Sequence, residues 1–242
     1  MRPRSTPPRG RGGVRRALAA LVVLTTATTG LAGCASGSVA SPPAGVDGLV
    51  IPTPSAEAGD FVTAVTNPWF PLRPGARMVY DAIDARGYHR LTVTVTRGPV
   101  VAGVATTARV ARQGGRATTD WYAQDRSGNV WWFGRAGEWR AGTDGAEAGL
   151  AVPAVPRVGD GWATGYADGA DVQVATVVAL DAALAVPQGD HYPVLLIDVA
   201  SPATGEDRNV YYAKGAGLLQ ENTQHGPYRV VQLVRLVPPP GS

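Results

Sequence analysis

The chain has 242 residues, of which 45% are hydrophobic, with 22 basic and 19 acidic side chains and a single cysteine. Six of the basic residues precede Cys34, which leaves 16 basic against 19 acidic residues beyond it, a formal net charge of −3. This balance excludes a polybasic surface for nucleic acid, and one cysteine cannot build a disulfide framework.

Residues 1–33 have the pattern of a bacterial export signal. Six arginines and no acidic residue precede an apolar run, from Ala17 to about Thr29, that is too short to span a bilayer. The segment ends in LAGC at residues 31–34, which resembles the lipobox of bacterial lipoproteins, where the cysteine is acylated and the peptide is cut before it. We therefore predict lipidation of Cys34 and anchoring at the extracytoplasmic face of the cell membrane through N-terminal acyl chains.

Residues 34–59 are predicted to be the lipidated N-terminus and a flexible tether. Ser, Pro, Ala and Gly dominate this stretch and no apolar periodicity is present, so a coil with an end-to-end distance of about 25–30 Å is expected. Residues 60–237 have the size of one domain with its own core, and residues 238–242 form a tail.

The dominant pattern of residues 60–237 is alternation with a period of two. Leu91, Val93 and Val95 alternate with threonines, which predicts a strand with one buried face that ends at Gly98-Pro99. Similar runs follow along the chain, and none shows a convincing helical stripe: RMVYDAI, VQVATVVAL, YPVLLIDVA, NVYYA and YRVVQLVRLV. The sequence predicts an all-β antiparallel domain, built as a barrel, a half-barrel or a sandwich.

Two stretches of the chain, about 67–135 and 153–221, resemble each other. Three anchors occur in the same order and at similar intervals in both: Gly75 with Gly159, Gly103 with Gly189, and Ala123 with Ala213. This pattern predicts two tandem-duplicated β-halves that share one core.

The segment DWYAQDRSGNVWWFG, at residues 120–134, is predicted to be a hairpin. Residues 126–129, RSGN, have the composition of a tight turn, with Gly128 at positive φ. Its aromatic residues fall on both faces of the strands, so we expect a core on both sides, with Trp139 and its loop as a cover for one of them.

This hairpin, together with NPWFPLRPG, EWRAGTDGAEAG, VPAVPRVGD and YYAKGAGLLQE, resembles a family of uncharacterised secreted and lipid-anchored bacterial proteins over about Asn67 to Glu221. The YYAxGxGL segment is also similar to TapB-like domains. The resemblance implies a β-rich domain at the cell surface and supplies no catalytic residues. The chain departs from the family at Arg135, where a carboxylate usually follows the aromatic run.

The sequence contains none of the common nucleophile, zinc, phosphate-loop or dinucleotide motifs, so we expect no catalytic residues, no metal and no cofactor. Carboxylates at Asp120, Asp125, Asp144 and Glu147 could serve sugar hydrolysis or calcium binding, although turn roles for Asp125 and Asp144 are favoured. Candidate ligand-binding residues are Asp120, Tyr122, Trp131, Trp132 and Asp144.

Three classes of function remain open from the sequence. A non-catalytic module that binds an envelope lipid, glycan or small ligand in an aromatic-lined hollow is favoured, because aromatic residues are concentrated in the hairpin. The alternatives are a structural or protein-interaction lipoprotein of the envelope and a carboxylate-dependent hydrolase. We expect the membrane, and no nucleic acid, as a partner.

Overall fold

The computed structural model describes residues 58–167 and 173–241. The chain divides into two units, Met1–Ala40 and Ser41–Ser242. The predicted signal peptide, Cys34 and tether residues 35–57 lie outside the described residues, whereas the sheet and core described below belong to the second unit. No helix among the described residues is long and apolar enough to cross a membrane.

One short 3-10 helix, Ala58–Asp60, precedes the strands. The strands are β1 (Phe61–Val62), β2 (Arg77–Asp84), β3 (Gly87–Val101), β4 (Val104–Gln113), β5 (Arg116–Asp125), β6 (Val130–Arg135), β7 (Trp139–Arg140), β8 (Glu147–Val152), β9 (Gly161–Ala163), β10 (Gly165–Tyr166), β11 (Val174–Val186), β12 (Gly189–Ser201), β13 (Glu206–Ala213), β14 (Gly217–His225) and β15 (Arg229–Val237).

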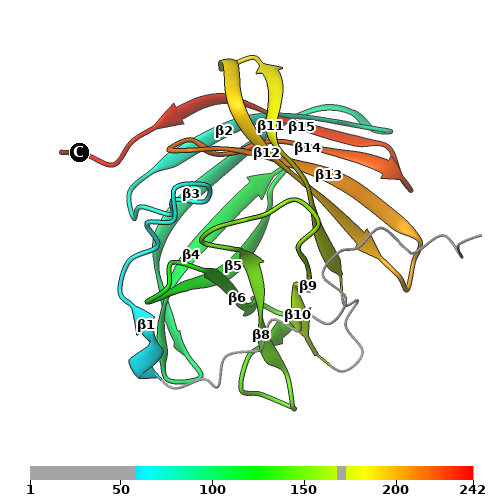
Figure 1. The fold of residues 1–242 in the computed structure, drawn as a ribbon. Helices are drawn as coiled ribbons and strands as arrows, with labels where there is room; N and C mark the ends of the chain where they lie inside the picture. The colour runs from blue at the N-terminus through cyan, green and yellow to red at the C-terminus, as the bar shows by residue number, and fades with distance from the viewer. Residues whose placement is uncertain (1–57, 168–172, 242) are drawn as a thin grey trace, which may run out of the picture. The chain divides into compact units, whose positions relative to one another are not determined.

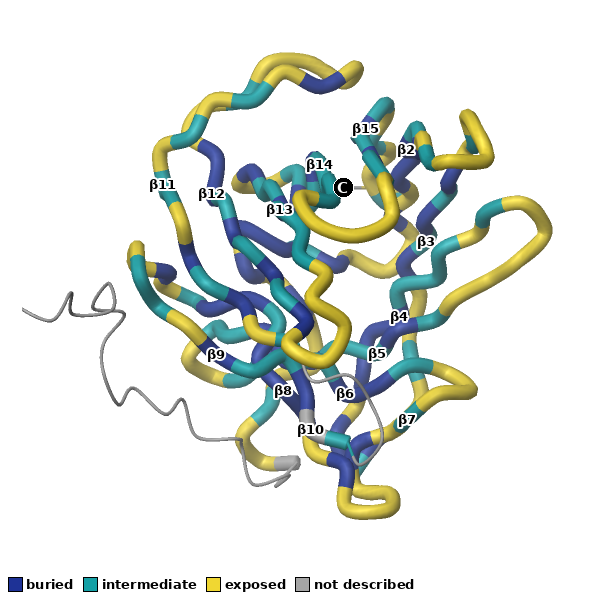
Figure 2. Tube along the Cα trace, turned by 90° about the vertical axis from the view of Figure 1, so that its right-hand side faces the viewer, coloured by how far each residue is buried: buried dark blue, intermediate teal, exposed yellow. Residues whose placement is uncertain are grey.

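The predicted all-β antiparallel fold is confirmed, and the described strands belong to one sheet. Strands β2 to β6 form one meander and β11 to β15 form another, and the two meanders join where β2 pairs with β15. The sheet ends at β10 on one side and at β9 on the other, and these two strands are separated in the chain by Thr164 alone. Figures 1 and 2 show the sheet curving around a common interior, with β4–β6 and β12–β14 on opposite sides of it.

Strand β3 shows why alternation predicts the core and where that prediction needs correcting. Leu91, Val93 and Val95 are buried, as their spacing indicates. The strand does not end at Gly98-Pro99, as expected, but continues to Val101 through a shift in register between Arg97 and Val100. A Cβ atom at Gly98 would lie 2.4 Å from the Thr106 Oγ1, so glycine allows the close strand approach that makes this β-bulge.

The loop before β2 connects the two meanders at one end of the sheet. The Asn67 side-chain amide donates hydrogen bonds to the carbonyls of Gly128 (2.9 Å) and Pro153 (3.1 Å), beside the first meander. The Pro68 carbonyl accepts a hydrogen bond of 2.8 Å from the Gly215 N–H in the second meander. Phe70 and Leu72 of the same loop are buried in the core, so the loop closes this end of the interior.

Several local features recur in the two predicted repeats. Gly75 and Gly159 both have positive φ, and each donates its N–H over 2.9 Å to the carbonyl of a buried valine, Val95 in one repeat and Val177 in the other. Gly103 and Gly189 both have positive φ and both lie where one long strand turns into the next. The duplication itself stays a prediction, which these correspondences support.

The candidate ligand-binding cavity

The curved sheet encloses a cavity with a volume of about 710 Å³. A second hollow of about 720 Å³ adjoins it and shares several wall residues with it, among them Arg109, Glu221 and Arg229. The second hollow extends past Arg86, Gly114 and Arg116, which are exposed at hairpin turns. The mouth of the cavity therefore lies at the end of the sheet opposite to the Asn67–Leu72 loop.

The closed end of the cavity is aromatic. The Phe70 ring meets Tyr122 of β5 edge-on, with 5.2 Å between ring centroids, and meets Tyr212 of β13 in the same way at 5.8 Å. Leu218 lies opposite Tyr212 at this end, and apolar side chains continue the wall toward the mouth, namely Ile197, Val199 and Val210. A ligand in this part of the cavity would contact carbon atoms and two phenolic rings.

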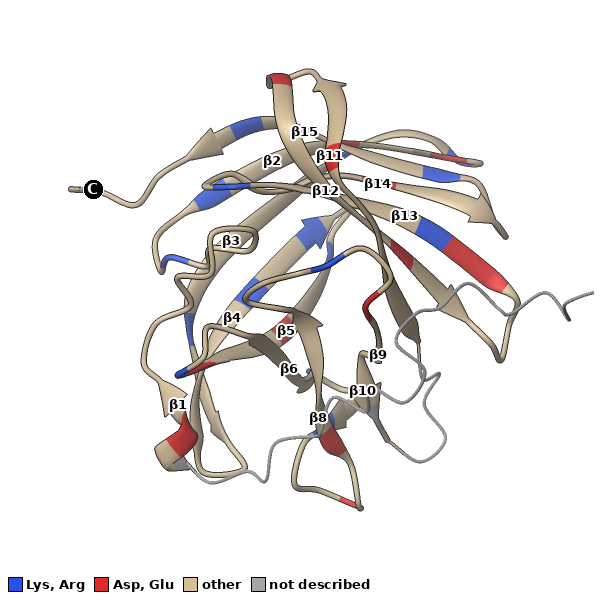
Figure 3. Ribbon diagram, in the orientation of Figure 1, with Lys and Arg blue, Asp and Glu red and all other residues tan. Residues whose placement is uncertain are grey.

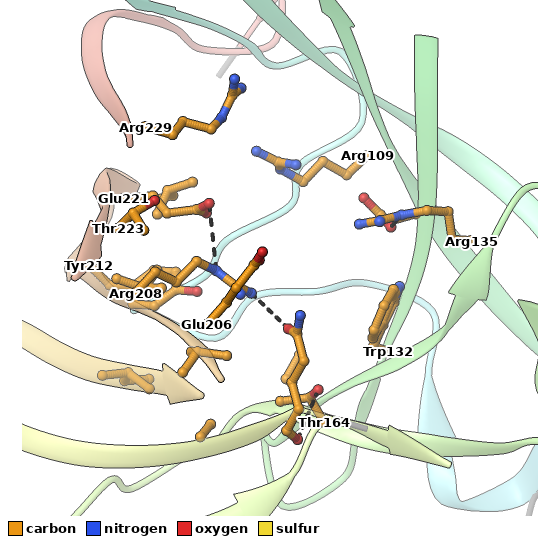
Figure 4. Close-up of a pocket in the computed structure, with 18 of the residues that line it drawn as sticks. Arg109, Trp132, Arg135, Thr164, Glu206, Arg208, Tyr212, Glu221, Thr223 and Arg229 are labelled. Carbon is orange, nitrogen blue, oxygen red and sulfur yellow. Dashed lines mark hydrogen bonds and ion pairs between the residues drawn. The ribbon is translucent and has the colours of Figure 1, made fainter. Parts of the chain in front are cut away.

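Charged residues line the middle and the mouth of the cavity. Most arginines there have a carboxylate partner: Arg135 Nε lies 2.7 Å from Asp120 Oδ1, Arg208 Nε lies 3.5 Å from Glu221 Oε1, and Arg229 lies 3.4 Å from Asp84. Figure 3 shows basic residues on both β4 and β13, and Figure 4 shows the guanidinium groups converging from opposite walls. The Asp120 side chain is only 4% exposed, so its pair with Arg135 neutralises a buried charge.

Arg109 of β4 differs from these arginines because no carboxylate of the described residues lies within ion-pair distance of it. Burial lowers the pKa of its guanidinium, but Tyr80, Tyr122, Asp120 and Glu221 together outweigh burial, so the pKa is raised above its ordinary value. Arg109 lines both hollows, and in Figure 4 its side chain points across the cavity toward Glu221 and Arg229. Arg109 is thus an inward cation with no carboxylate partner among the described residues.

Two tyrosines bring neutral hydrogen-bond donors to the same region. Burial raises the pKa of both Tyr122 and Tyr212, and the charges of Asp120 and Glu221 raise these pKa values further. Both hydroxyls therefore keep their protons at neutral pH. Within residues 58–167 and 173–241, neither hydroxyl forms a hydrogen bond with another residue, and Arg109 lies near enough to both to lower their pKa values slightly.

Trp132 forms part of the wall between the cavity and the loop that carries Trp139. Its ring meets that of Trp139 edge-on at 4.8 Å, and the Arg135 guanidinium lies 5.4 Å from its centroid. The indole N–H is buried without an acceptor in the described part of the chain. Because this N–H lies below the cavity surface, the ring contributes an apolar and π surface rather than a donor.

The structure separates the five candidate residues taken from the sequence. Asp120, Tyr122 and Trp132 all line the cavity. Trp131 points away from it: the side chain is buried, and its indole N–H donates to the Asp125 carboxylate over 2.9 Å. Asp144 lies in a turn with φ of 51° and lines a separate, smaller hollow beside Trp121 and Arg140. The five residues therefore do not form one site.

The predicted hairpin is present as β5 and β6, and Gly128 in its turn has a φ of 92°. Asp125 has the turn role expected of it, because its carboxylate accepts hydrogen bonds from the Asn129 backbone N–H and side-chain amide. Phe133 is fully buried against Phe61 on the face opposite to the cavity, and the Arg140 guanidinium covers Trp121. The hairpin therefore has a covered face on one side and lines the cavity on the other through Asp120, Tyr122 and Trp132, in place of the expected core on both sides.

Sequence reasoning missed the basic half of the cavity, which is formed by Arg109, Arg208 and Arg229. A usable signal was present in the alternation of the strands. Arg208, Val210 and Tyr212 occupy one face of β13, and all three line the cavity, so a charged, an apolar and an aromatic residue share one inward face. Such mixed inward faces are typical of a strand that borders a cavity rather than a filled core.

No protein-family model matches the chain, and no curated protein matches it. Among solved structures, a protein from Bacteroides fragilis assigned as exported, with a YmcC-like fold, is 13% identical with a TM-score of 0.39, over 70% of this chain and 99% of that one. A protein from Parabacteroides distasonis assigned as a lipoprotein is 13% identical with a TM-score of 0.31, over 69% of this chain and 97% of the other.

Proposed function

We propose that the protein is an extracytoplasmic lipoprotein that holds a small ligand, without chemical change, in the cavity of its curved sheet. The observation that carries the proposal is the cavity itself, whose volume of about 710 Å³ is in the range of pockets that enclose one small molecule. Its wall combines aromatic and aliphatic side chains at the closed end with charged and polar groups toward the mouth, so it offers both an apolar surface and groups that can orient a ligand.

The environment of the cavity carboxylates favours binding over hydrolysis. Hydrolysis of sugars by paired carboxylates requires two acidic groups that face each other across the substrate. Asp120 is held by Arg135 and Glu221 by Arg208, while Asp144 lies in a different hollow. Asp120 and Glu221 thus balance arginines in the wall.

The cavity can be tested with a neutral apolar dye, N-phenylnaphthylamine, titrated into the unit Ser41–Ser242, which contains the whole sheet, the core and the cavity. We expect saturable fluorescence enhancement at one site. Ala151→Trp should abolish it, because Ala151 lines the cavity and an indole there would fill part of the volume.

The matched control is Ala117→Trp, which makes the same change at an exposed position of β5 outside the cavity wall. It should bind the dye as the wild type does. Thermal unfolding of both variants shows whether they are folded. A folded Ala151→Trp variant with unchanged dye binding would contradict the proposal.

The location of the protein requires a separate test, and the lipobox pattern together with the resemblance over Asn67–Glu221 supports it. We expect the full chain to label with radioactive palmitate and to sediment with membranes. Cys34→Ala should abolish labelling and leave an unprocessed precursor or a released protein. Identical labelling, size and fractionation of the variant and the parent would contradict lipid anchoring at Cys34.

A further inference from the structure

The cavity has two chemically different parts, and Arg109 is among the residues that line both of them. The closed end offers Phe70 and the apolar side chains of β12 and β13, whereas the adjoining hollow toward the mouth is lined mainly by charged and polar groups. Arg109 belongs to the walls of both. A molecule that fits both parts must be apolar at one end and polar at the other.

The charges around Arg109 determine the sign of that polar end. The neighbouring carboxylates Asp120, Glu221 and Asp84 each pair with another arginine, so their charges are already neutralised. Arg109 has no such partner among the residues that the structure describes. A guanidinium without an ion-pair partner inside a cavity favours an anion, and its planar array of N–H donors suits a carboxylate, sulfonate or phosphate group.

Tyr122 and Tyr212 add two donors to the same place. They come from β5 and β13, on opposite sides of the interior, and both meet the Phe70 ring. Their hydroxyls have no acceptor among the described residues, and both lie in the electrostatic range of Arg109. One guanidinium and two phenol groups thus surround the boundary between the apolar and the polar part.

We infer that the ligand is an amphiphilic acid, whose anionic group is bound by Arg109 and the hydroxyls of Tyr122 and Tyr212 and whose apolar part lies against Ile197 and Val210. This inference rests on the proposed function, because it specifies the chemistry of a ligand in the same cavity. Charge-assisted hydrogen bonds from Arg109 stabilise the anionic group of the ligand when it is buried at this position. The apolar part gains free energy from the carbon surface of β12 and β13.

Two dyes of nearly the same shape test this inference in the unit Ser41–Ser242. Anilinonaphthalene sulfonate carries an anionic group that N-phenylnaphthylamine lacks. We expect the wild type to bind both dyes. In Arg109→Met, the affinity for the sulfonate dye should fall by about tenfold or more, while the affinity for the neutral dye should change less than about twofold. The double variant Tyr122→Phe with Tyr212→Phe keeps both rings. Its affinity for the sulfonate dye alone should fall, by a smaller factor than in Arg109→Met.

Arg112→Met is the matched control, because Arg112 lies on the same strand but on its exposed outer face. It should bind both dyes as the wild type does. Dodecanoate should displace the bound sulfonate dye from the wild type, whereas inorganic phosphate at the same concentration should not, since it has no apolar part.

The outcomes separate this inference from the proposed function. Binding of the neutral dye alone by the wild type would overturn the anionic ligand and leave the cavity as a binding site. Unchanged binding of the sulfonate dye by Arg109→Met would overturn the role of Arg109. An equal loss of affinity for both dyes in folded Arg109→Met would overturn it too. Displacement by inorganic phosphate as strong as that by dodecanoate would overturn the amphiphile. Binding of neither dye by the wild type would overturn both proposals.

Discussion

Hairpins β5–β6 and β13–β14 have matching backbone registers but different charges. Asp120 pairs with Arg135 across the first hairpin, and Val210 pairs with Glu221 at the corresponding place in the second. Tyr122 faces Trp132, and Tyr212 faces Leu218, and in both hairpins a register shift immediately precedes the tyrosine. The backbone thus recurs while the inward side chains diverge.

The difference shows how one backbone can build two unlike walls of a cavity. In the first hairpin the buried carboxylate and its arginine are direct cross-strand partners, so the charge is neutralised within the hairpin. In the second, Glu221 faces a valine and takes Arg208 as its partner, at the longer distance of 3.5 Å. The first wall is therefore tightly paired, and the second leaves its charges more accessible to the cavity.

The largest effect is expected where the first hairpin has a side chain that the second lacks. Trp131 is buried opposite Ala123, and the position opposite Ala213 is Gly217. Trp131→Ala should lower the free energy of unfolding by about 3–5 kcal/mol, because a large cavity remains and Asp125 loses a donor. Denaturant unfolding measures this loss. Tyr211→Ala, at a half-buried position of β13, should cost clearly less, and equal losses would contradict the comparison.

The buried ion pair should give the next largest effect. Arg135→Met leaves the Asp120 carboxylate buried without its partner, which should cost about 3 kcal/mol at neutral pH. The double variant Asp120→Asn with Arg135→Met should recover part of that loss, because the amide carries no charge. Chemical denaturation of the single and double variants forms the test, and a double variant less stable than Arg135→Met would show that the isolated charge is not the cause.

The turns of the two hairpins offer a smaller contrast. Gly128 and Gly215 both have positive φ, of 92° and 80°. A Cβ atom at Gly128 would lie 3.3 Å from Ala154 Cβ, whereas nothing lies within 4 Å of one at Gly215. Alanine at either position should cost about 1–2 kcal/mol for the left-handed backbone, with the Gly128 variant at the upper end or beyond. Paired thermal melts would refute this order if Gly215→Ala were the less stable variant.

The smallest effect is expected from the longer ion pair of the second hairpin. Arg208 and Glu221 side chains are about a third exposed, so solvent screens their attraction. Glu221→Gln should change the free energy of unfolding by less than about 1 kcal/mol, and added salt should reduce the difference further. Urea titrations at low and high salt measure both quantities. A loss as large as that of Arg135→Met would remove the distinction between the two walls.

The strands and the hairpin turn could be predicted because their signals are local. Alternation along β3 identifies its buried valines, and the composition of residues 126–129 indicates a turn with a glycine at positive φ. The extension of β3 beyond Pro99 could not be predicted, because it depends on the contact of Gly98 with Thr106 on the neighbouring strand. That contact arises from the pairing of β3 with β4, which the alternation within β3 alone does not indicate.

The cavity could be predicted only in part for a related reason. Alternation assigns Tyr122 and Arg109 to a face of a strand, but it does not tell whether that face meets a filled core or an open interior. That choice depends on the curvature of the sheet and on the Asn67–Leu72 loop, which connects residues far apart in the chain. The pairing of Glu221 with Arg208 instead of Arg109 likewise follows from positions in space.

The short strands at the two ends of the sheet affect how the molecule behaves beside other copies of itself. Exposed sheet edges present rows of free N–H and C=O groups that can recruit strands from neighbouring molecules. Here the ends are β10 and β9, of two and three residues, and β9 pairs with only Val174–Thr176 of the much longer β11. The rest of β11, up to Val186, has no partner strand on that side among the described residues, so this edge is where a neighbouring molecule would add a strand.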